Sequence, residues 1–418
     1  MSKLSSIKLS KSGSLSFPLL GKTVLLSCLI TGIVSCGGGG NKGSDGGNSN
    51  FTKHAELISN SADIMNAGYI KLASSTFSLK SKIDEYCADA TSIADQTKRA
   101  AAQASFKIAM NDVQYSLQHS AKSQGIGPAL DIERGIEVIY SWPLTSSCRV
   151  DGLLAINTLE PGLPINRRGL DVIEYLLFVD PSSNHSCTSE EAQLTAFNAL
   201  STDEKQLRRC GYMKNAIVDV VTSVNEIKDG WDPAIGDHLG EMKNSNIDAL
   251  VTLNKVSDAM YYIADVGKED KLDQPMGGGR TNTTPSCGVG VICPADVESP
   301  NSNLSLDNLI ANVKSFQELY FGGSVANKAT NIGFDDWLEA EGATVVATKM
   351  ANDIEQTLTE LNKLKTDCST LQNAIVNCKT QLDGFFDGSF QGLTRGFRDG
   401  VLPKLGLQPP QSSLTDAD

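Results

Sequence analysis

Apolar residues recur at intervals of three and four along most of this 418-residue chain, which is the spacing of one face of an α-helix. Between residues 51 and 124 the pattern predicts two long helices, the second over 91–121, with Cys87 between them. Further helical segments are predicted at 189–200, 203–228, 245–266, 305–321 and 342–380. No segment alternates apolar and polar residues over the length of a strand. The sequence therefore predicts an all-α fold of two four-helix-bundle-like domains.

The boundary between the two bundles is expected near residues 232–241, where the helical pattern is interrupted. This places an N-terminal bundle at 51–235 and a C-terminal bundle at 236–405, followed by a short polar tail at 406–418. Within the second bundle, the helical pattern breaks over 267–303, a stretch rich in Pro and Gly. Because this stretch is longer than an ordinary connection, we expect a functional loop or a surface excursion.

The segment 166–178 contains an acidic pair next to apolar residues. Asp171 and Glu174 are three residues apart, so on a helix they lie on one face, beside apolar residues that would fix the helix in a core. Two interpretations of the spacing stay open. The acids are either favourable charges near the positive end of a helix dipole or carboxylates held for a ligand.

A weaker copy of this pattern occurs 164 residues later in the chain. Gly333-x-Asp335 repeats Gly169-x-Asp171, but Leu338 stands where the first copy has Glu174. The copy predicts that the two bundles are a pseudo-repeat.

The N-terminal residues have the features of an export signal. Lysines precede an apolar run at 23–34 that is too short to span a bilayer, and the run ends in Ile-Val-Ser-Cys36, which resembles a bacterial lipobox. We therefore expect a signal peptide at 1–35, acylation of Cys36, and a flexible tether at 36–50. These features predict a lipid-anchored protein of the bacterial cell envelope. Residue 37, which follows the acylated cysteine, is Gly rather than Asp, and in Gram-negative lipoproteins this favours transfer to the outer membrane. The domain would then face the periplasm or the cell surface.

The charge of the chain limits its partners. The formal net charge is −13, and the expected signal peptide contains four lysines and no acid, so the remaining chain is still more acidic. This balance argues against nucleic acid or anionic lipid as the main partner and suits a mild attraction of cations.

Once Cys28, in the signal peptide, and Cys36 are set aside, eight cysteines remain. An even number of cysteines is typical of disulfides in an exported protein. Proximity in sequence favours three pairs and leaves a fourth: Cys187–Cys210, Cys287–Cys293, Cys368–Cys378 and Cys87–Cys148. A continuous helix would hold Cys368 and Cys378 about 15 Å apart, beyond the limit of about 7 Å for a bridge. The chain must therefore bend between them if they pair. Zinc-binding spacings such as Cys-x-x-Cys are absent from the sequence.

The acidic segment resembles the hallmark of the imelysin family of bacterial envelope proteins. That family carries Gly-x-His-x-x-Glu followed by Tyr or Phe and two leucines, and this chain has Gly169-Leu-Asp171-Val-Ile-Glu174-Tyr-Leu-Leu. Asp171 stands where the family usually has histidine.

Two further elements are similar to the same family. Trp142-Pro143 is followed by Arg149-x-Asp151, and Arg209-Cys-x-Tyr212 precedes Trp231. The resemblance covers most of 50–405 in scattered motifs and implies the same all-helical architecture. It also implies a pocket for a metal ion or small ligand, formed by Gly169, Asp171, Glu174, Trp142, Arg149, Asp151, Arg209 and Tyr212.

The resemblance implies a role in bacterial iron acquisition, with a protein partner in iron uptake. Asp171 and Glu174 are the candidate metal ligands, since carboxylates suit iron or another hard divalent or trivalent cation better than zinc. The nearby arginines would instead suit an anionic ligand, or would simply neutralise the acids.

Two alternatives to a binding lipoprotein stay open. The family takes its name from a protein reported to cleave peptides, but a hydrolytic zinc site usually has three protein ligands that include histidine, and the motif histidine is Asp171 here. A binding protein is therefore favoured over a metallopeptidase, and no catalytic residue is assigned. The other alternative is a non-catalytic cell-surface interaction protein in which 267–303 contacts a partner.

Overall fold

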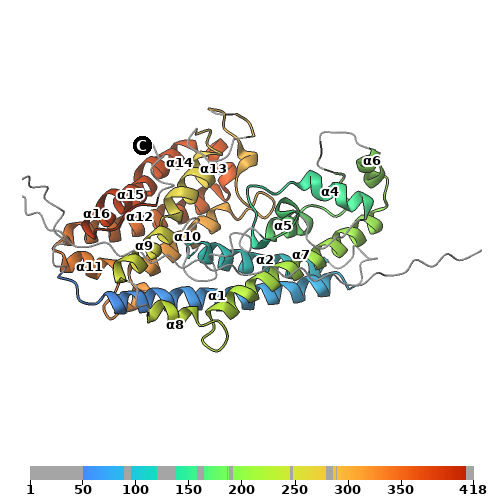
Figure 1. Cartoon of the computed structure of the whole chain (residues 1–418). Coiled ribbons are helices and arrows are strands. Elements are labelled where there is room, and N and C mark those ends of the chain that lie inside the picture. Colours follow the sequence, from blue (N-terminus) through green and yellow to red (C-terminus); the bar gives the residue numbers. More distant parts are fainter. Residues whose placement is uncertain are drawn as a thin grey trace, which may run out of the picture. The chain divides into compact units, whose positions relative to one another are not determined.

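The computed structural model describes residues 50–88, 96–119, 138–157, 164–185, 187, 192–244, 248–278, 286–288 and 290–410. All regular structure in these ranges is helical, so the predicted all-α fold is confirmed (Figure 1). The expected signal peptide, Cys36, nearly all of the expected tether and the last eight residues of the tail lie outside the described ranges. None of the described helices is both long and apolar enough to cross a membrane.

Three long helices dominate the N-terminal part: α1 (His54–Tyr86), α2 (Gln96–Leu117) and α7 (Thr202–Trp231). α1 packs along both α2 and α7, and the shorter α5 (Leu170–Phe178) packs on α2 and α7 (Figure 1). The remaining elements of this part are α4 (Ser147–Ile156), the 3-10 turn η2 (Ile165–Arg167) and α6 (Ala192–Asn198). The two long helices predicted on either side of Cys87 correspond to α1 and α2.

In the C-terminal part, α10 (Ser305–Tyr320) and α12 (Thr344–Cys368) pack against each other, and α10 also packs on α2 (Figure 1). The shorter helices of this part are α8 (His238–Lys243), α9 (Ala249–Met260), η4 (Pro294–Asp296), η5 (Val325–Asn327), α11 (Phe334–Ala340), α13 (Leu371–Asn377), α14 (Lys379–Phe385), α15 (Gln391–Arg395) and α16 (Leu402–Lys404). Three π-helical segments complete this part: η3 (Ile263–Asp273), η6 (Phe386–Phe390) and η7 (Gly396–Val401).

A single buried apolar cluster extends from Phe51 to Leu407. α1 contributes to it on both sides of the expected boundary, since it contacts α2 and α7 and also α9 and α10. Ser49–Asp418 accordingly forms one compact unit. The division into two bundles near residue 235 and the pseudo-repeat stay predictions.

The helical pattern continues further than the sequence suggests. Residues Ile263–Asp273 form the π-helix η3, so the expectation that regular structure breaks at residue 267 is wrong. The reason is that η3 buries four consecutive charged residues, Lys268, Glu269, Asp270 and Lys271, where a helix of ordinary spacing would bury apolar ones. π-helical turns inside helices are frequent at functional sites.

Two of the predicted disulfides are wrong. Cys87 pairs with Cys210 rather than Cys148, at a Cα–Cα distance of 5.4 Å, and Cys148 pairs with Cys187 at 4.7 Å. The physical reason is that α1 and α7 pack side by side, which brings the end of α1 to the first turns of α7. Sequence distance carries no information about that packing.

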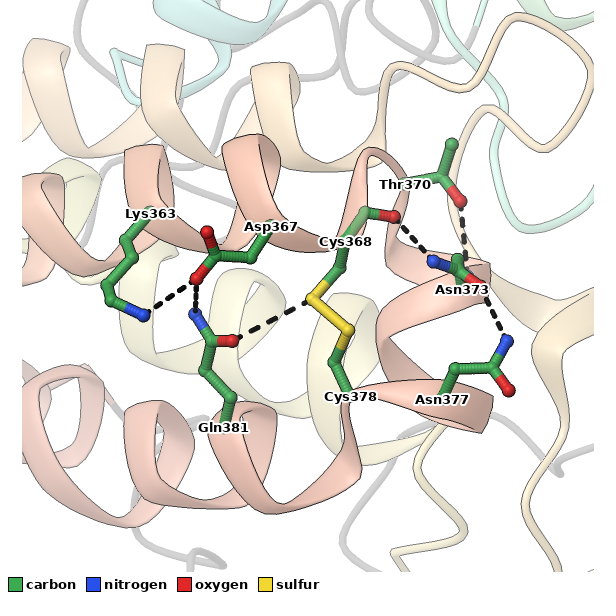
Figure 2. The surroundings of a disulfide bond; sticks show 8 residues. All are labelled: Lys363, Asp367, Cys368, Thr370, Asn373, Asn377, Cys378 and Gln381. Atoms are coloured by element: carbon green, nitrogen blue, oxygen red, sulfur yellow. Dashed lines mark hydrogen bonds and ion pairs between the residues drawn. A yellow bond between two sulfur atoms is a disulfide. The ribbon is translucent and has the colours of Figure 1, made fainter.

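The other two pairs, Cys287–Cys293 and Cys368–Cys378, are confirmed. The chain bends between Cys368 and Cys378, as the distance argument requires: α12 ends at Cys368, α13 begins at Leu371, and the Cα atoms are 6.4 Å apart (Figure 2). Gln381 donates to Asp367 across the bend at 3.1 Å, and Lys363 pairs with the same carboxylate at 2.7 Å. The bridge therefore joins α12 to the chain that returns beside it.

Candidate functional site

A pocket of about 690 Å³ lies between α5, residues 142–147 and residues 295–301. Three carboxylates line it, those of Asp171, Glu174 and Asp296. Trp142 and Tyr175 provide aromatic surface, and several amides and hydroxyls complete the wall. No Lys, Arg or His lines the pocket among the described residues. The lining therefore suits a positively charged occupant.

The backbone at Gly169 sets where α5 begins. Gly169 is the N-cap of the helix at φ 90°, a conformation that L-residues rarely adopt, and a Cβ atom there would lie 3.0 Å from the carbonyl oxygen of Val138. The apolar residues of α5 from Leu170 to Leu177 are buried. As a result the helix is fixed with Asp171 and Glu174 lining the pocket.

Asp171 is 8% exposed and is held through one oxygen only. Its Oδ2 accepts hydrogen bonds from the backbone N–H of Ser141 at 2.6 Å and from the Ser141 hydroxyl at 3.2 Å. No other described residue donates a hydrogen bond to its Oδ1, although the backbone N–H of Asp171 itself lies close to the carboxylate. Burial raises the pKa of Asp171 to about 7, although the hydrogen bonds from Ser141 act in the opposite direction.

Glu174 is 2% exposed and is held in the same manner. Its Oε1 accepts from the backbone N–H groups of Asn301 at 2.9 Å and Ser302 at 2.7 Å, and the Ser302 hydroxyl also lies close enough to the carboxylate to lower its pKa. Burial raises the pKa of Glu174 to about 7, and the negative charge of Asp171 adds to the rise. Each carboxylate thus has one oxygen anchored by backbone donors.

Of the other predicted site residues, Trp142 lines the pocket and Asp151 and Arg209 lie behind its wall. The hydroxyl of Tyr175 donates to Asp151 at 2.8 Å, and the Arg209 guanidinium lies over the Tyr175 ring at 5.4 Å. Both Asp151 and Arg209 are fully buried. Their contacts hold Tyr175, and any direct role in ligand binding stays a prediction.

Tyr212 and Arg149 also lie outside the pocket lining. Tyr212 is buried and donates to the carbonyl oxygen of Arg167 at 2.5 Å, which fixes the turn η2 just before Gly169. Arg149 is exposed in the first turn of α4, and its backbone N–H donates to the N-cap Ser146. The structure therefore gathers three predicted residues at the pocket, Trp142, Asp171 and Glu174.

Sequence reasoning missed the residues that anchor the two acids. Asn301 and Ser302 act through backbone N–H groups, and Ser141 acts through its backbone N–H and its hydroxyl. Every residue except proline carries a backbone N–H, so no sequence signal could reveal these donors. Tyr175 follows Glu174 directly within the recognised motif, so its aromatic side chain could have been predicted as part of the pocket.

The donor set fits part of a site for a hard cation. Asp171 and Glu174 each offer one carboxylate oxygen, whereas Ca²⁺ takes six to eight oxygen ligands and Mg²⁺ takes six. No group of three or more His, Cys, Asp or Glu residues close enough to bind a metal occurs among the described residues. Water, backbone oxygens or the ligand itself would have to supply the remaining positions.

Comparisons with known proteins support the expected family. The family model described as Peptidase_M75, imelysin, matches residues 65–382. The structure is similar to the crystal structure of a "putative iron-regulated protein A precursor" from Parabacteroides distasonis, with a TM-score of 0.63 and 16% identity. The similarity covers 84% of this chain and 95% of that one, and at this identity it shows the fold. No curated protein matches this chain.

Proposed function

Because the chain belongs to the imelysin family, whose model matches more than half of it, we propose that it is an extracytoplasmic binding protein that binds a cation through Asp171 and Glu174. The observation that supports this most is the geometry of the pair. Two buried carboxylates lie in one pocket, each with a single oxygen anchored by backbone donors. The similar crystal structure is described as that of an iron-regulated protein, so iron is the first metal to test and iron uptake is the proposed role.

The electrostatics of the pocket favour a cation over an anion. Burial makes two adjacent negative charges costly, which is why the pKa of each acid lies near 7. A bound metal ion would neutralise this charge. Asp171 and Glu174 would hold it through Oδ1 and Oε2, and binding would release the protons that the acids carry near neutral pH.

Calorimetric titration tests this proposal. Fe²⁺ under anaerobic conditions, Fe³⁺ as a soluble complex, Ca²⁺ and Zn²⁺ are added to the wild type and to Asp171→Asn and Glu174→Gln, which keep the side-chain shapes. We expect at least one metal to bind the wild type and to bind each variant at least about tenfold more weakly. Asp335→Asn is the matched control, since it removes an equally buried acid elsewhere. Equal affinity in all four proteins would refute the proposal.

Peptide hydrolysis is the second candidate, because the family model is named after a peptidase and a carboxylate with a pKa near 7 suits a general base. Glu174 is then the expected base. Turnover of unfolded peptides that is lost in Glu174→Gln and on addition of a chelator would favour this alternative over simple binding.

A further inference from the structure

A buried ion pair lies next to the segment that anchors Glu174. Lys271, on the π-helix η3, is 3.1 Å from Oε1 of Glu298, and the two side chains are 1% and 0% exposed. Neither residue lines the pocket. Burying an ion pair away from water costs free energy unless its hydrogen bonds are complete. The presence of this buried pair therefore needs a structural or functional explanation.

The hydrogen bonds around this pair come from several elements. The Lys271 ammonium also donates to Oε1 of Gln114 on α2 at 2.6 Å and to Oδ1 of Asn312 on α10 at 2.8 Å. Oε1 of Glu298 also accepts from Gln114 at 2.8 Å and from the Tyr140 hydroxyl at 2.6 Å. Glu298 is thereby fixed by groups from α2, η3 and the residue that precedes Ser141.

The backbone of Glu298 leads directly to Glu174. Its carbonyl oxygen accepts from the hydroxyl of Ser305 on α10, and Ser299 then takes a left-handed conformation at φ 51°. Two residues later the N–H groups of Asn301 and Ser302 hold Oε1 of Glu174. The position of these two donors therefore depends on where Glu298 is fixed.

We propose that Lys271 and Glu298 are positioning residues of the cation site, which fix residues 298–302 so that two backbone N–H groups hold Glu174 with its other oxygen open to the ligand. This inference rests on the proposed function and assigns a role to residues that do not touch the ligand. Positioning residues of this kind typically change metal affinity by about 10–100-fold when they are lost.

Lys271→Met separates positioning from simple electrostatics. Removing a positive charge near the pocket should strengthen cation binding if charge alone matters, because the remaining charge is more negative. If Lys271 acts by holding Glu298, the same variant should bind the cation more weakly. The two explanations thus predict opposite signs.

The experiment measures the affinity of the full-length protein for the metal that binds the wild type. We expect a loss of about tenfold or more in Lys271→Met and an affinity closer to the wild type in Lys271→Arg, which keeps the charge. Tyr140→Phe removes one bond to Glu298 without leaving a buried charge unpaired, and provides a milder test if Lys271→Met does not fold. Lys328→Met, which removes a lysine paired with a buried acid far from Glu174 in sequence, should bind as the wild type does.

A second measurement does not depend on the cation. Amide hydrogen exchange of Asn301 and Ser302 should become faster in Lys271→Met and in Tyr140→Phe but not in Lys328→Met. Unchanged exchange, or cation binding as tight as in the wild type, would overturn the positioning role. If the wild type binds no cation, the proposed function fails, and the exchange result alone decides whether the ion pair positions the donors to Glu174.

Discussion

The starts of α5 and α11 share a sequence pattern but differ in charge. Gly169 precedes Asp171 as Gly333 precedes Asp335, and the two aspartates are similarly buried, at 8% and 4% exposure. At α11 the chain supplies its own cation, since the Lys328 ammonium lies 3.4 Å from Oδ2 of Asp335. At α5 the neighbour is a second acid, and no basic residue lines the pocket within the described chain.

This difference indicates that the pocket lacks a positive charge among its described lining residues. In both places a neighbour engages one oxygen of the aspartate: Ser141 donates to Oδ2 of Asp171, and Lys328 pairs with Oδ2 of Asp335. At α11 the lysine offsets part of the cost of burying the acid, and the position three residues on is the apolar Leu338. At α5 that position is Glu174, a second buried acid, so protons or the proposed cation would have to compensate its charge.

Making α11 resemble α5 should have the largest effect. Leu338 is fully buried, so Leu338→Glu adds a buried acid near Asp335, in addition to the neighbouring Asp336, without prepared donors. We expect a loss of about 3–5 kcal/mol in the free energy of unfolding, measured by urea denaturation. The reciprocal variant Glu174→Leu should lose cation binding but lose less stability than Leu338→Glu, because an apolar side chain replaces a buried acid while the N–H groups of Asn301 and Ser302 lose their acceptor. A stable Leu338→Glu protein would show that α11 tolerates a second acid without an anchored site.

The pH dependence of stability should differ between the two helix starts. The pKa values of Asp171 and Glu174 are raised to about 7 in the folded state, and that of Asp335 to about 6, so the folded protein binds more protons than the unfolded chain. Stability from these groups is complete below about pH 4 and is lost as pH rises to about 7 for the pair and about 6 for Asp335. We expect the loss from the pair to exceed the loss from Asp335, because two acids contribute and both pKa values are raised further.

Thermal unfolding of the metal-free protein between pH 4.5 and 8 measures this effect. The double variant Asp171→Asn/Glu174→Gln should lose the part of the pH-dependent decline in stability that extends to pH 7. The variant Asp335→Asn should lose only the part of that decline below about pH 6. A saturating cation should remove the decline, since it binds the deprotonated pair. The same slope in all variants would mean that other groups cause it.

The sequence predicts well where the helices lie along the chain, but it predicts poorly which helices pack against each other. The apolar spacing predicts α1, α2, α7 and α10, because packing of one helical face is encoded locally. The disulfides of Cys87 and Cys148 depend on which helices lie side by side, and that is set by tertiary packing.

The candidate site shows the same limit. Asp171 and Glu174 are recognisable because two acids three residues apart beside apolar residues share one helical face. Their anchors at Ser141, Asn301 and Ser302 are backbone groups, brought together from segments up to 128 residues away. The buried charges of η3 are hidden as well, because charged residues normally indicate surface.

The glycines of the two motifs should respond differently to substitution. Gly169→Ala strains a backbone at φ 90°, whereas Gly333 has an extended φ of −122° but would place a Cβ atom 2.4 Å from the carbonyl oxygen of Tyr320. We expect each alanine variant to lose about 1–3 kcal/mol, measured by denaturation. Only Gly169→Ala should also weaken cation binding, because it moves the start of the helix that carries both acids. A weaker affinity in Gly333→Ala would mean that the two motifs are coupled.

The smallest effect is expected from removing the lysine at α11. Lys328 is partly exposed and pairs with a buried carboxylate, so Lys328→Met should raise the pKa of Asp335 further and cost about 1 kcal/mol at pH 7. The control is Lys379→Met, which breaks a closer pair, 2.7 Å from Asp383, in which both side chains are exposed. Its cost should be smaller, because solvent already screens both charges. Equal effects in the two variants would show that burial gives Asp335 no special need for a cation, and Lys328 would then give no support to the cation proposed for the pocket of Asp171 and Glu174.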